Sequence, residues 1–251
     1  MFEPKDILTV EDIQELYVVT HIDNISSILD KHLLSHHLAK DIEHRNISNH
    51  EVQDIRSKKP IFIEQIPEHT PEGESTDSKG LLETLWDYVC MFIQPYNAML
   101  FTTRHEDVCI MRLDSSVLNE SGVLITDRNA SCQDAKFFRP HQWSLCGENA
   151  AYIFERHSYS NNNTFARKSV RQIEVLCPNI VKASFIRGFF VKNQTDAERV
   201  RSVIGSQKLD ISINSNIFFL DNSRTLNDFA PLANELDTAD ELIGLAALRI
   251  I

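Results

Sequence analysis

The chain has 251 residues, of which 42% are hydrophobic and 24% charged, and a formal net charge of −11. This composition is typical of a globular protein and excludes disorder, collagen and coiled coil as descriptions of the whole chain. No apolar run approaches the roughly 20 residues that span a bilayer, and the first residues lack the basic and apolar regions of a signal peptide. We therefore expect a cytoplasmic protein with no membrane partner, built as a single domain over residues 1–251.

The acidic balance excludes general binding to nucleic acid through net charge, because phosphate contacts need lysine and arginine. A local basic site is still compatible with it. The five cysteines form no CxxC pair, so we expect small buried side chains rather than a disulfide framework. The histidines at positions 36, 37, 44 and 50 match no zinc-binding pattern, and we expect no metal.

Short runs of β-branched and aromatic residues, bounded by turn residues, predict seven strands. They lie at Glu15–His21, Tyr88–Ile93, Val108–Leu113, Gly122–Thr126, Gln172–Cys177, Phe185–Val191 and Ile211–Phe219. Helices are predicted at Asn24–Lys31, His50–Lys59, Glu148–Arg156, Asp196–Ile204 and, with a wide apolar face, Ala239–Ile251. Strands outnumber helices and are not regularly separated by them, which favours an α+β fold over a doubly wound α/β fold.

Two further local features are predicted. Thr195 and Glu198 have the spacing of a capping box, with Thr195 as the N-cap of its helix. Polar segments rich in Pro, Gly, Ser or Asn predict surface loops at Glu64–Gly80 and His157–Ser169.

The segment from Arg171 to Cys177 is the most informative one. Read as a strand, it places Ile173, Val175 and Cys177 on one face and Gln172, Glu174 and Leu176 on the other. A carboxylate on such an apolar strand is costly unless it has partners or opens onto a cleft. The alternative is an edge strand with a solvated glutamate. A long asparagine-rich loop that leads into a Gln-x-Glu strand is, however, the layout of ADP-ribosyltransferases.

The first predicted strand ends in Thr20-His21, where a ligand's polar groups can reach it, and a helix follows. In the alternative interpretation, His21 is structural and Asp23 or Asn24 caps the helix.

Five blocks in order make the chain resemble the DarT toxins, which ADP-ribosylate DNA bases using NAD. They are Tyr17-x-x-Thr20-His21-Ile22-Asp23-Asn24 continuing to Leu33-Leu34-Ser35-His36, Val52-Gln53-Asp54-Ile55-Arg56, Asp87-Tyr88-Val89 with Met99-Leu100, Thr126-Asp127-x-Asn129-Ala130, and Arg167-Lys168-x-x-Arg171-Gln172-x-Glu174. Arg128 stands where this family usually has glycine. The resemblance implies an ADP-ribosyltransferase-like α+β fold with central antiparallel-rich sheets and peripheral helices. The family-like core covers about residues 15–206, and residues 207–251 form an extension of unknown role.

The resemblance also implies roles for individual residues, with NAD as co-substrate and no metal. The catalytic residues would be Glu174, which stabilises an oxocarbenium-like transition state, and Arg56. The NAD-binding residues would be Thr20, His21, Asn24, Tyr88 and Met99. The acceptor-binding residues would be Tyr159, Asn161, Asn162, Asn163, Arg167, Lys168, Arg171 and Gln172, because basic residues with interleaved aromatics suit single-stranded nucleic acid.

A DarT-like enzyme would transfer ADP-ribose to thymine or guanine of single-stranded DNA, as the toxin of a toxin–antitoxin system. Its partner would be a separate DarG-like macrodomain antitoxin. Two alternatives stay open from the sequence. One is ADP-ribosylation of RNA, and the other is a catalytically inactive nucleic-acid-binding relative, although the presence of Glu174 and His21 argues against the latter.

Overall fold

The computed structural model describes residues 7–64, 79–146, 153 and 171–218. Its strands are β1 Ile7–Thr9, β2 Glu15–His21, β3 Leu33–Leu34, β4 Pro60–Phe62, β5 Lys79–Thr84, β6 Tyr88–Phe92, β7 Val108–Asp114, β8 Leu124–Thr126, β9 Phe137–Phe138, β10 Ser144–Cys146, β11 Glu174–Pro178, β12 Ile180–Val181, β13 Ile186–Val191 and β14 Asp210–Ile213. Its α-helices are α1 Ile25–Lys31, α2 His36–Ala39, α3 His50–Lys58, α4 Ala98–Thr102 and α7 Gln194–Ile204.

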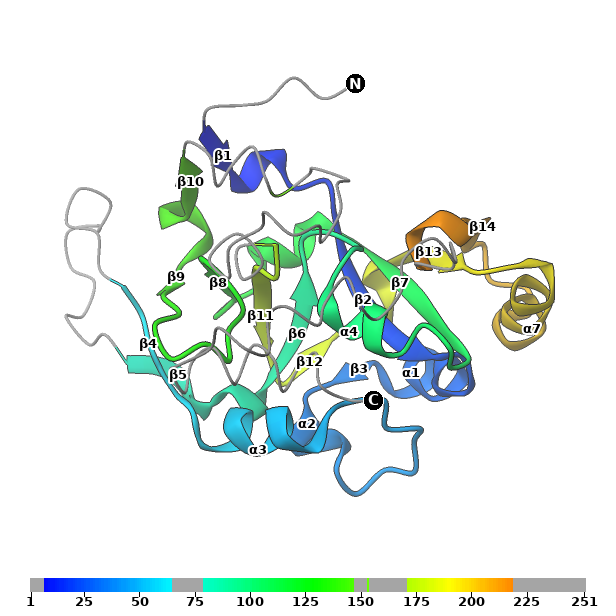
Figure 1. Ribbon diagram of the computed structural model, residues 1–251, viewed down its shortest axis with the longest axis horizontal. Helices are drawn as coiled ribbons and strands as arrows, with labels where there is room; N and C mark the ends of the chain where they lie inside the picture. Colours follow the sequence, from blue (N-terminus) through cyan, green and yellow to red (C-terminus); the bar gives the residue numbers. More distant parts are fainter. Residues whose placement is uncertain (1–6, 65–78, 147–152, 154–170, 219–251) are drawn as a thin grey trace, which may run out of the picture.

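An eight-stranded sheet in the order β14-β13-β7-β2-β6-β11-β8-β9 organises the molecule. Its neighbouring strands are antiparallel except β13 and β14, which are parallel. Figure 1 shows β13, β14 and α7 at one end of this arrangement and β4, β5 and β9 at the other. Three two-stranded pairs, β1–β10, β12–β3 and β4–β5, lie outside the large sheet. The predicted α+β class and antiparallel-rich sheet are confirmed.

The sheet is nearly divided in its middle. β2 pairs with β7 along seven residues, yet it pairs with β6 only where Tyr17 faces Phe92. Beyond this pair no ladder joins β2 to β6, although both strands continue. The two halves of the sheet therefore diverge on one side of Tyr17 and Phe92.

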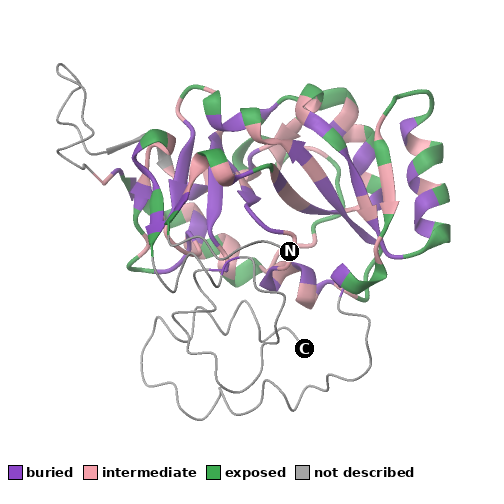
Figure 2. Cartoon of the chain, turned by 90° about the horizontal axis from the view of Figure 1, so that it is seen from above, coloured by how far each residue is buried: buried purple, intermediate pink, exposed green. Residues whose placement is uncertain are grey.

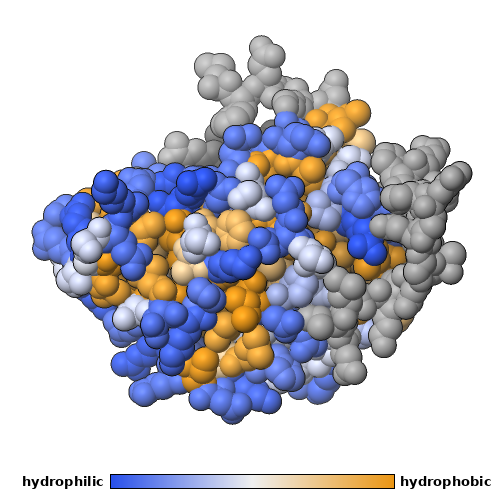
Figure 3. Space-filling model, turned by 180° about the vertical axis from the view of Figure 1, so that it is seen from behind, coloured by the Kyte–Doolittle hydropathy of each residue, from blue (hydrophilic) through white to orange (hydrophobic). Residues whose placement is uncertain are grey.

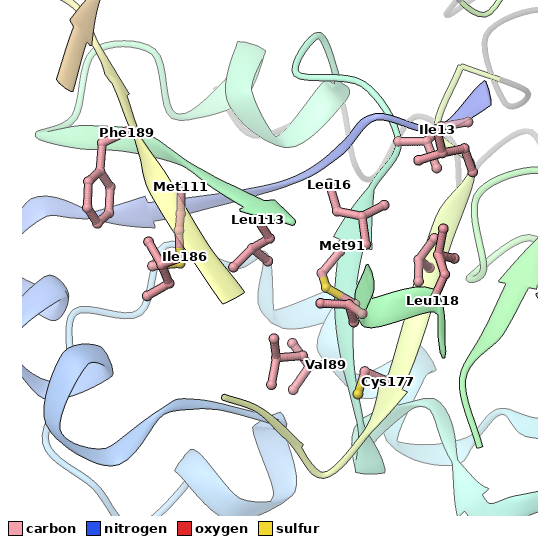
Figure 4. Close-up of a cluster of buried hydrophobic side chains, with 14 of the residues drawn as sticks. Ile13, Leu16, Val89, Met91, Met111, Leu113, Leu118, Cys177, Ile186 and Phe189 are labelled. Carbon is pink, nitrogen blue, oxygen red and sulfur yellow. The ribbon is translucent and has the colours of Figure 1, made fainter. Parts of the chain in front are cut away.

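The main core lies on one face of this sheet. Figure 4 shows Leu16, Met91, Met111, Leu113 and Phe189 converging from four strands, and each of these side chains is fully buried. Helix α7 covers the same core with Ala197, Val200 and Ile204, at the three- and four-residue spacing of one helical face. In Figure 2, α7 at the right edge carries buried residues on its inner side and exposed ones outside.

The predicted strand bounds agree best with the observed ones for the long strands. β2 has the predicted bounds, and β6, β7 and β13 differ from them by one residue. The run Ile211–Phe219 is wrong as one strand. β14 ends at Ile213, and Ser215–Phe218 forms a 3₁₀ turn instead, because Ile217 and Phe218 turn inward to pack against Val108 and Ile110.

The predicted capping box of α7 is also wrong. The helix begins two residues earlier than expected, and its N-cap is Asn193, whose side chain accepts a hydrogen bond of 2.9 Å from the Asp196 amide. The loop predicted at Glu64–Gly80 ends before Lys79, where β5 begins. Most of this loop, the loop His157–Ser169 and the helix Ala239–Ile251 lie outside the described residues, as does Glu148–Arg156 apart from Ile153.

On the rear face, apolar side chains gather between hydrophilic ones (Figure 3). Within the described ranges, no helix is both long and apolar enough to cross a membrane. The same ranges contain no group of three His, Cys, Asp or Glu side chains arranged to hold a metal ion. All five cysteines are free, and Cys146 is exposed rather than buried as expected.

Gly188 permits the close approach of β14 to β13. A β-carbon at this position would overlap the backbone of Asp210, the residue paired with it. We expect Gly188→Ala to lower the free energy of unfolding by about 1–3 kcal/mol, the usual cost of overpacking. Urea unfolding measures this, with the exposed Ser206→Ala as control. Equal stability of Gly188→Ala and its parent would show that the two strands tolerate a wider spacing.

Candidate active site

A cavity of about 670 Å³ lies where the sheet divides. Residues 18–20 of β2 line one side and residues 88–90 and 92 of β6 line the other, so the cavity begins where the ladder between these strands stops. Further parts of the wall come from four helices, α1, α2, α3 and α4, and from the segment 42–49. Its volume is in the range of sites that hold small organic ligands.

Glu174 stands at the wall of this cavity and is fully buried. Its strand, β11, is an interior strand between β6 and β8. The predicted alternation is confirmed, because Ile173, Val175 and Cys177 join the main core and Leu176 joins the cluster on the opposite face. The alternative of an edge strand with a solvated glutamate is therefore wrong. The strand itself begins at Glu174, and Gln172 lies in the turn before it.

Arg56 of α3 compensates the buried charge of Glu174. Its Nη2 donates to Oε2 over 2.6 Å and its Nη1 donates to Oε1 over 3.3 Å, so the contact is bidentate. Nη1 also donates to Ser131 Oγ over 3.3 Å, and Nη2 contacts the Cys90 sulfur. Burial by itself would lower the pKa of Arg56, but Cys90 and Glu174 together raise it above its ordinary value. The guanidinium therefore stays charged.

A turn between β8 and β9 completes the surroundings of Glu174. The Ala130 amide donates to Oε1 over 3.2 Å, and the Glu174 amide donates to Thr126 Oγ1 over 2.9 Å. Lys59, one residue past α3, donates to the Cys132 carbonyl and so ties this turn to the helix that carries Arg56. Burial, aided by the charge of Arg56, lowers the pKa of Lys59. Sequence reasoning missed these contacts, although the fourth resemblance block contains Thr126 and Ala130.

Gln172 and Asn129 lie together at the same wall as Glu174. Asn129 Nδ2 donates to Gln172 Oε1 over 3.1 Å, and Asn129 Oδ1 accepts from the Ser131 amide over 2.9 Å. The turn that supports Glu174 thus also holds the side chain of Gln172.

Four of the five predicted NAD-binding residues line the cavity, namely Thr20, Asn24, Tyr88 and Met99. His21 does not. Its Nδ1 accepts a hydrogen bond of 3.1 Å from the Asp23 amide and caps the short turn Ile22–Asn24, as the structural alternative describes. A direct contact of His21 with NAD stays a prediction without support from this geometry.

Asn24 has a structural task as well as a place in the cavity wall. Its Oδ1 accepts from the Arg45 amide over 2.8 Å, and its Nδ2 donates to the Arg45 carbonyl over 2.9 Å. Both ends of one side-chain amide therefore fasten the segment 42–49, which lines the cavity. Asn24 does not cap α1 through its side chain.

The predicted acceptor-binding residues are only partly visible. Tyr159, Asn161, Asn162, Asn163, Arg167 and Lys168 lie outside the described residues. Arg171 is described and is 6% exposed, with its carbonyl accepting from Gln94 Nε2. Its contact with the acceptor therefore stays a prediction.

His36 is a half-buried imidazole in the cavity wall that the site predictions omitted. Burial, with smaller contributions from Arg56 and His44, lowers its pKa to about 4. In the unfolded chain a histidine takes up its proton near pH 6.5. Below that pH the unfolded state therefore binds a proton that the folded state refuses until about pH 4, so stability falls as the pH falls through this window.

We expect His36→Asn to remove this part of the pH dependence. Between pH 7 and pH 4.5 the parent should lose about 1–3 kcal/mol more than the variant, because the variant has no imidazole to protonate on unfolding. Urea unfolding at the two pH values measures the difference. The exposed His105→Asn should behave as the parent does. Equal losses in His36→Asn and the parent would contradict the assignment.

A known protein family and a curated protein both match most of this chain. Residues 17–219 match the family described as "DarT: ssDNA thymidine ADP-ribosyltransferase, DarT". A DNA ADP-ribosyl transferase–DNA ADP-ribosyl glycohydrolase fusion protein of Thermosipho africanus is 25% identical over 214 residues, which are 83% of this chain and 50% of that protein. The chain thus spans about half the length of this curated relative.

Two solved structures share the fold. Thermus sp. 2.9 DarT in complex with ADP-ribosylated ssDNA matches with a TM-score of 0.62 and 21% identity, over 84% of this chain and 99% of that one. The same protein in complex with NAD+ matches with a TM-score of 0.57 and 20% identity, over 83% and 98%. The fold is therefore that of solved DarT structures, and the match over residues 17–219 shows that the chain belongs to the DarT family.

Proposed function

We propose that this protein is an ADP-ribosyltransferase that uses NAD as co-substrate and modifies thymine in single-stranded DNA. The observation that carries the proposal is the buried Glu174–Arg56 pair at the wall of a cavity of about 670 Å³. A fully buried carboxylate facing a cavity is costly for folding alone. Its presence is explained if the charge acts on a ligand there.

The chemistry needs a negative charge at one place. As the nicotinamide–ribose bond breaks, nicotinamide takes the bonding electrons and the ribose becomes oxocarbenium-like, with positive charge at its anomeric carbon. Glu174 stabilises that charge electrostatically. A ring nitrogen of the base then bonds to this carbon and loses its proton, for which we propose a Glu174 oxygen as the acceptor. Arg56 and the Ala130 amide hold the carboxylate in one orientation while this happens.

Thymine is the base we propose because the family description that matches residues 17–219 specifies thymidine. Guanine and an RNA acceptor are the alternatives. Oligonucleotides with one candidate base each, in DNA and RNA form, distinguish them by the mass increase of one ADP-ribose after incubation with NAD. A catalytically inactive relative would give no increase with any of them.

We also propose that the enzyme acts as a toxin with a DarG-like partner that removes the modification. The fusion relative of Thermosipho africanus combines a DNA ADP-ribosyl transferase with a DNA ADP-ribosyl glycohydrolase. An enzyme that modifies its own cell's DNA requires such a counterpart. Co-expression with a DNA ADP-ribosyl glycohydrolase that relieves growth arrest would support this pairing.

Glu174→Gln should lower transfer about a hundred- to thousandfold, because the main electrostatic stabiliser loses its charge. The measurement is the rate of ADP-ribosylation of a thymine oligonucleotide, with circular dichroism to show that the variant is folded. The matched control is Glu120→Gln, which removes an exposed charge paired with Lys182 outside the cavity. Near-normal transfer by folded Glu174→Gln would overturn the proposed mechanism.

The acceptor prediction for Arg167 and Lys168 also has a direct test. Replacing both by alanine should weaken oligonucleotide binding irrespective of sequence. It should also flatten the plot of log affinity against log salt by about 1.4, since each phosphate contact on a single strand contributes about 0.7. Arg201→Ala with Lys208→Ala makes the same change of charge at exposed positions outside the cavity wall. Identical salt plots for the two double variants would mean that DNA enters elsewhere.

A further inference from the structure

The amide pair of Asn129 and Gln172 has a defined polarity. The backbone amide of Ser131 can only donate, so the atom of Asn129 that receives this bond, 2.9 Å away, must be the oxygen Oδ1. The other end of the Asn129 side chain is then the NH₂ group. That group donates to Gln172, and its partner 3.1 Å away must be the oxygen Oε1. One backbone N–H thereby fixes the orientation of two side-chain amides in succession.

The consequence is that Gln172 directs its NH₂ end away from Asn129. The two N–H bonds of this group are the donors that Gln172 presents to a base that enters the cavity. Gln172 and Asn129 both line the cavity together with Glu174. Glu174 is two residues further along the chain, which places it at most about 7 Å away along the backbone. An acceptor base that reacts beside Glu174 therefore lies within reach of this donor.

We propose that Asn129 is a positioning residue that sets the class of acceptor base, by holding Gln172 so that it offers a donor to an exocyclic carbonyl. The inference rests on the proposed function and specifies its substrate. Thymine carries the carbonyl O4 and guanine the carbonyl O6, whereas cytosine and adenine carry amino groups at the corresponding positions. A fixed N–H donor pairs with the first two and meets another donor in the last two.

The matched probes are two oligonucleotides that differ in one base, thymine in one and 5-methylcytosine in the other. Both bases have the methyl group, and they differ in the carbonyl or amino group and in the proton on the neighbouring ring nitrogen. Affinity without NAD is measured by fluorescence anisotropy at one salt concentration, so that the reactivity of the base does not enter. Because the two strands carry the same phosphates, the ratio of their affinities cancels the phosphate contribution.

The parent should prefer the thymine strand about tenfold, in line with the discrimination of one good amide–base pairing. Asn129→Asp reverses the polarity. One aspartate oxygen still accepts from the Ser131 amide, and the other now accepts from the Gln172 NH₂ group, which turns Gln172 Oε1 toward the base. The preference should fall at least tenfold, to equality or to an excess for 5-methylcytosine. A general loss of structure would also remove the preference, so circular dichroism has to show that the variant is folded, and only a folded variant is counted.

A second variant decides the question if Asn129→Asp does not fold. In Gln172→Glu, Asn129 is unchanged and its NH₂ group holds one carboxylate oxygen, so that an acceptor oxygen faces the base; the preference should again fall at least tenfold. An unchanged thymine preference in the folded variant, or in both, overturns the inference. That outcome is distinct from failure of the proposed function, in which the parent itself adds ADP-ribose to none of the oligonucleotides.

Discussion

The charge of Glu174 in the middle of an eight-stranded sheet is the constraint on which the rest of the site depends. A carboxylate without partners in such a place would cost several kcal/mol. Two groups meet the carboxylate, Arg56 from α3 and the Ala130 amide from the turn after β8, while Thr126 bonds the Glu174 backbone. Removing one partner of a buried pair typically costs 3–5 kcal/mol. The geometry of the proposed catalytic site and folding stability are therefore coupled at this point.

The division of the sheet provides the space that this charge requires. β2 and β6 are neighbours in the sheet, yet they share only the Tyr17–Phe92 pair. A fully paired sheet would fill this place with a ladder, whereas the diverging strands leave a cavity with Glu174 at its wall. Residues of the segment 42–49 also line the cavity, and Asn24 fastens this segment through both ends of its amide. A residue expected to bind substrate thus helps to build the wall of the binding site.

The parts of this fold that can be predicted from sequence are those where side chains alternate regularly along a strand, or where burial of a charged group has a large free-energy cost. The range Glu15–His21 and the alternation from Ile173 to Cys177 follow from side chains on a pleated strand. Two-residue strands such as β3 and β9 are too short to show an alternation of apolar and polar side chains. The N-cap of α7 was misplaced because Asn193 and Thr195 are both good caps, and only the three-dimensional structure selects one. The hydrogen bond from Ala130 comes from its backbone amide, and since every residue except proline has this group, the residue pattern does not predict the bond. Arg56, predicted as a catalytic residue, lines the cavity, and its guanidinium holds Glu174.

One turn serves both charge stabilisation and, in our proposal, recognition of the base. Ala130 and Ser131 contact the Glu174–Arg56 pair, and Asn129 between β8 and β9 orients Gln172. Arg128 lies in the same turn and joins Asp127 and Asp134 by ion pairs. These pairs connect residues on either side of Asn129 and Ala130, so they favour the turn conformation in which Asn129 reaches Gln172 and Ala130 reaches Glu174.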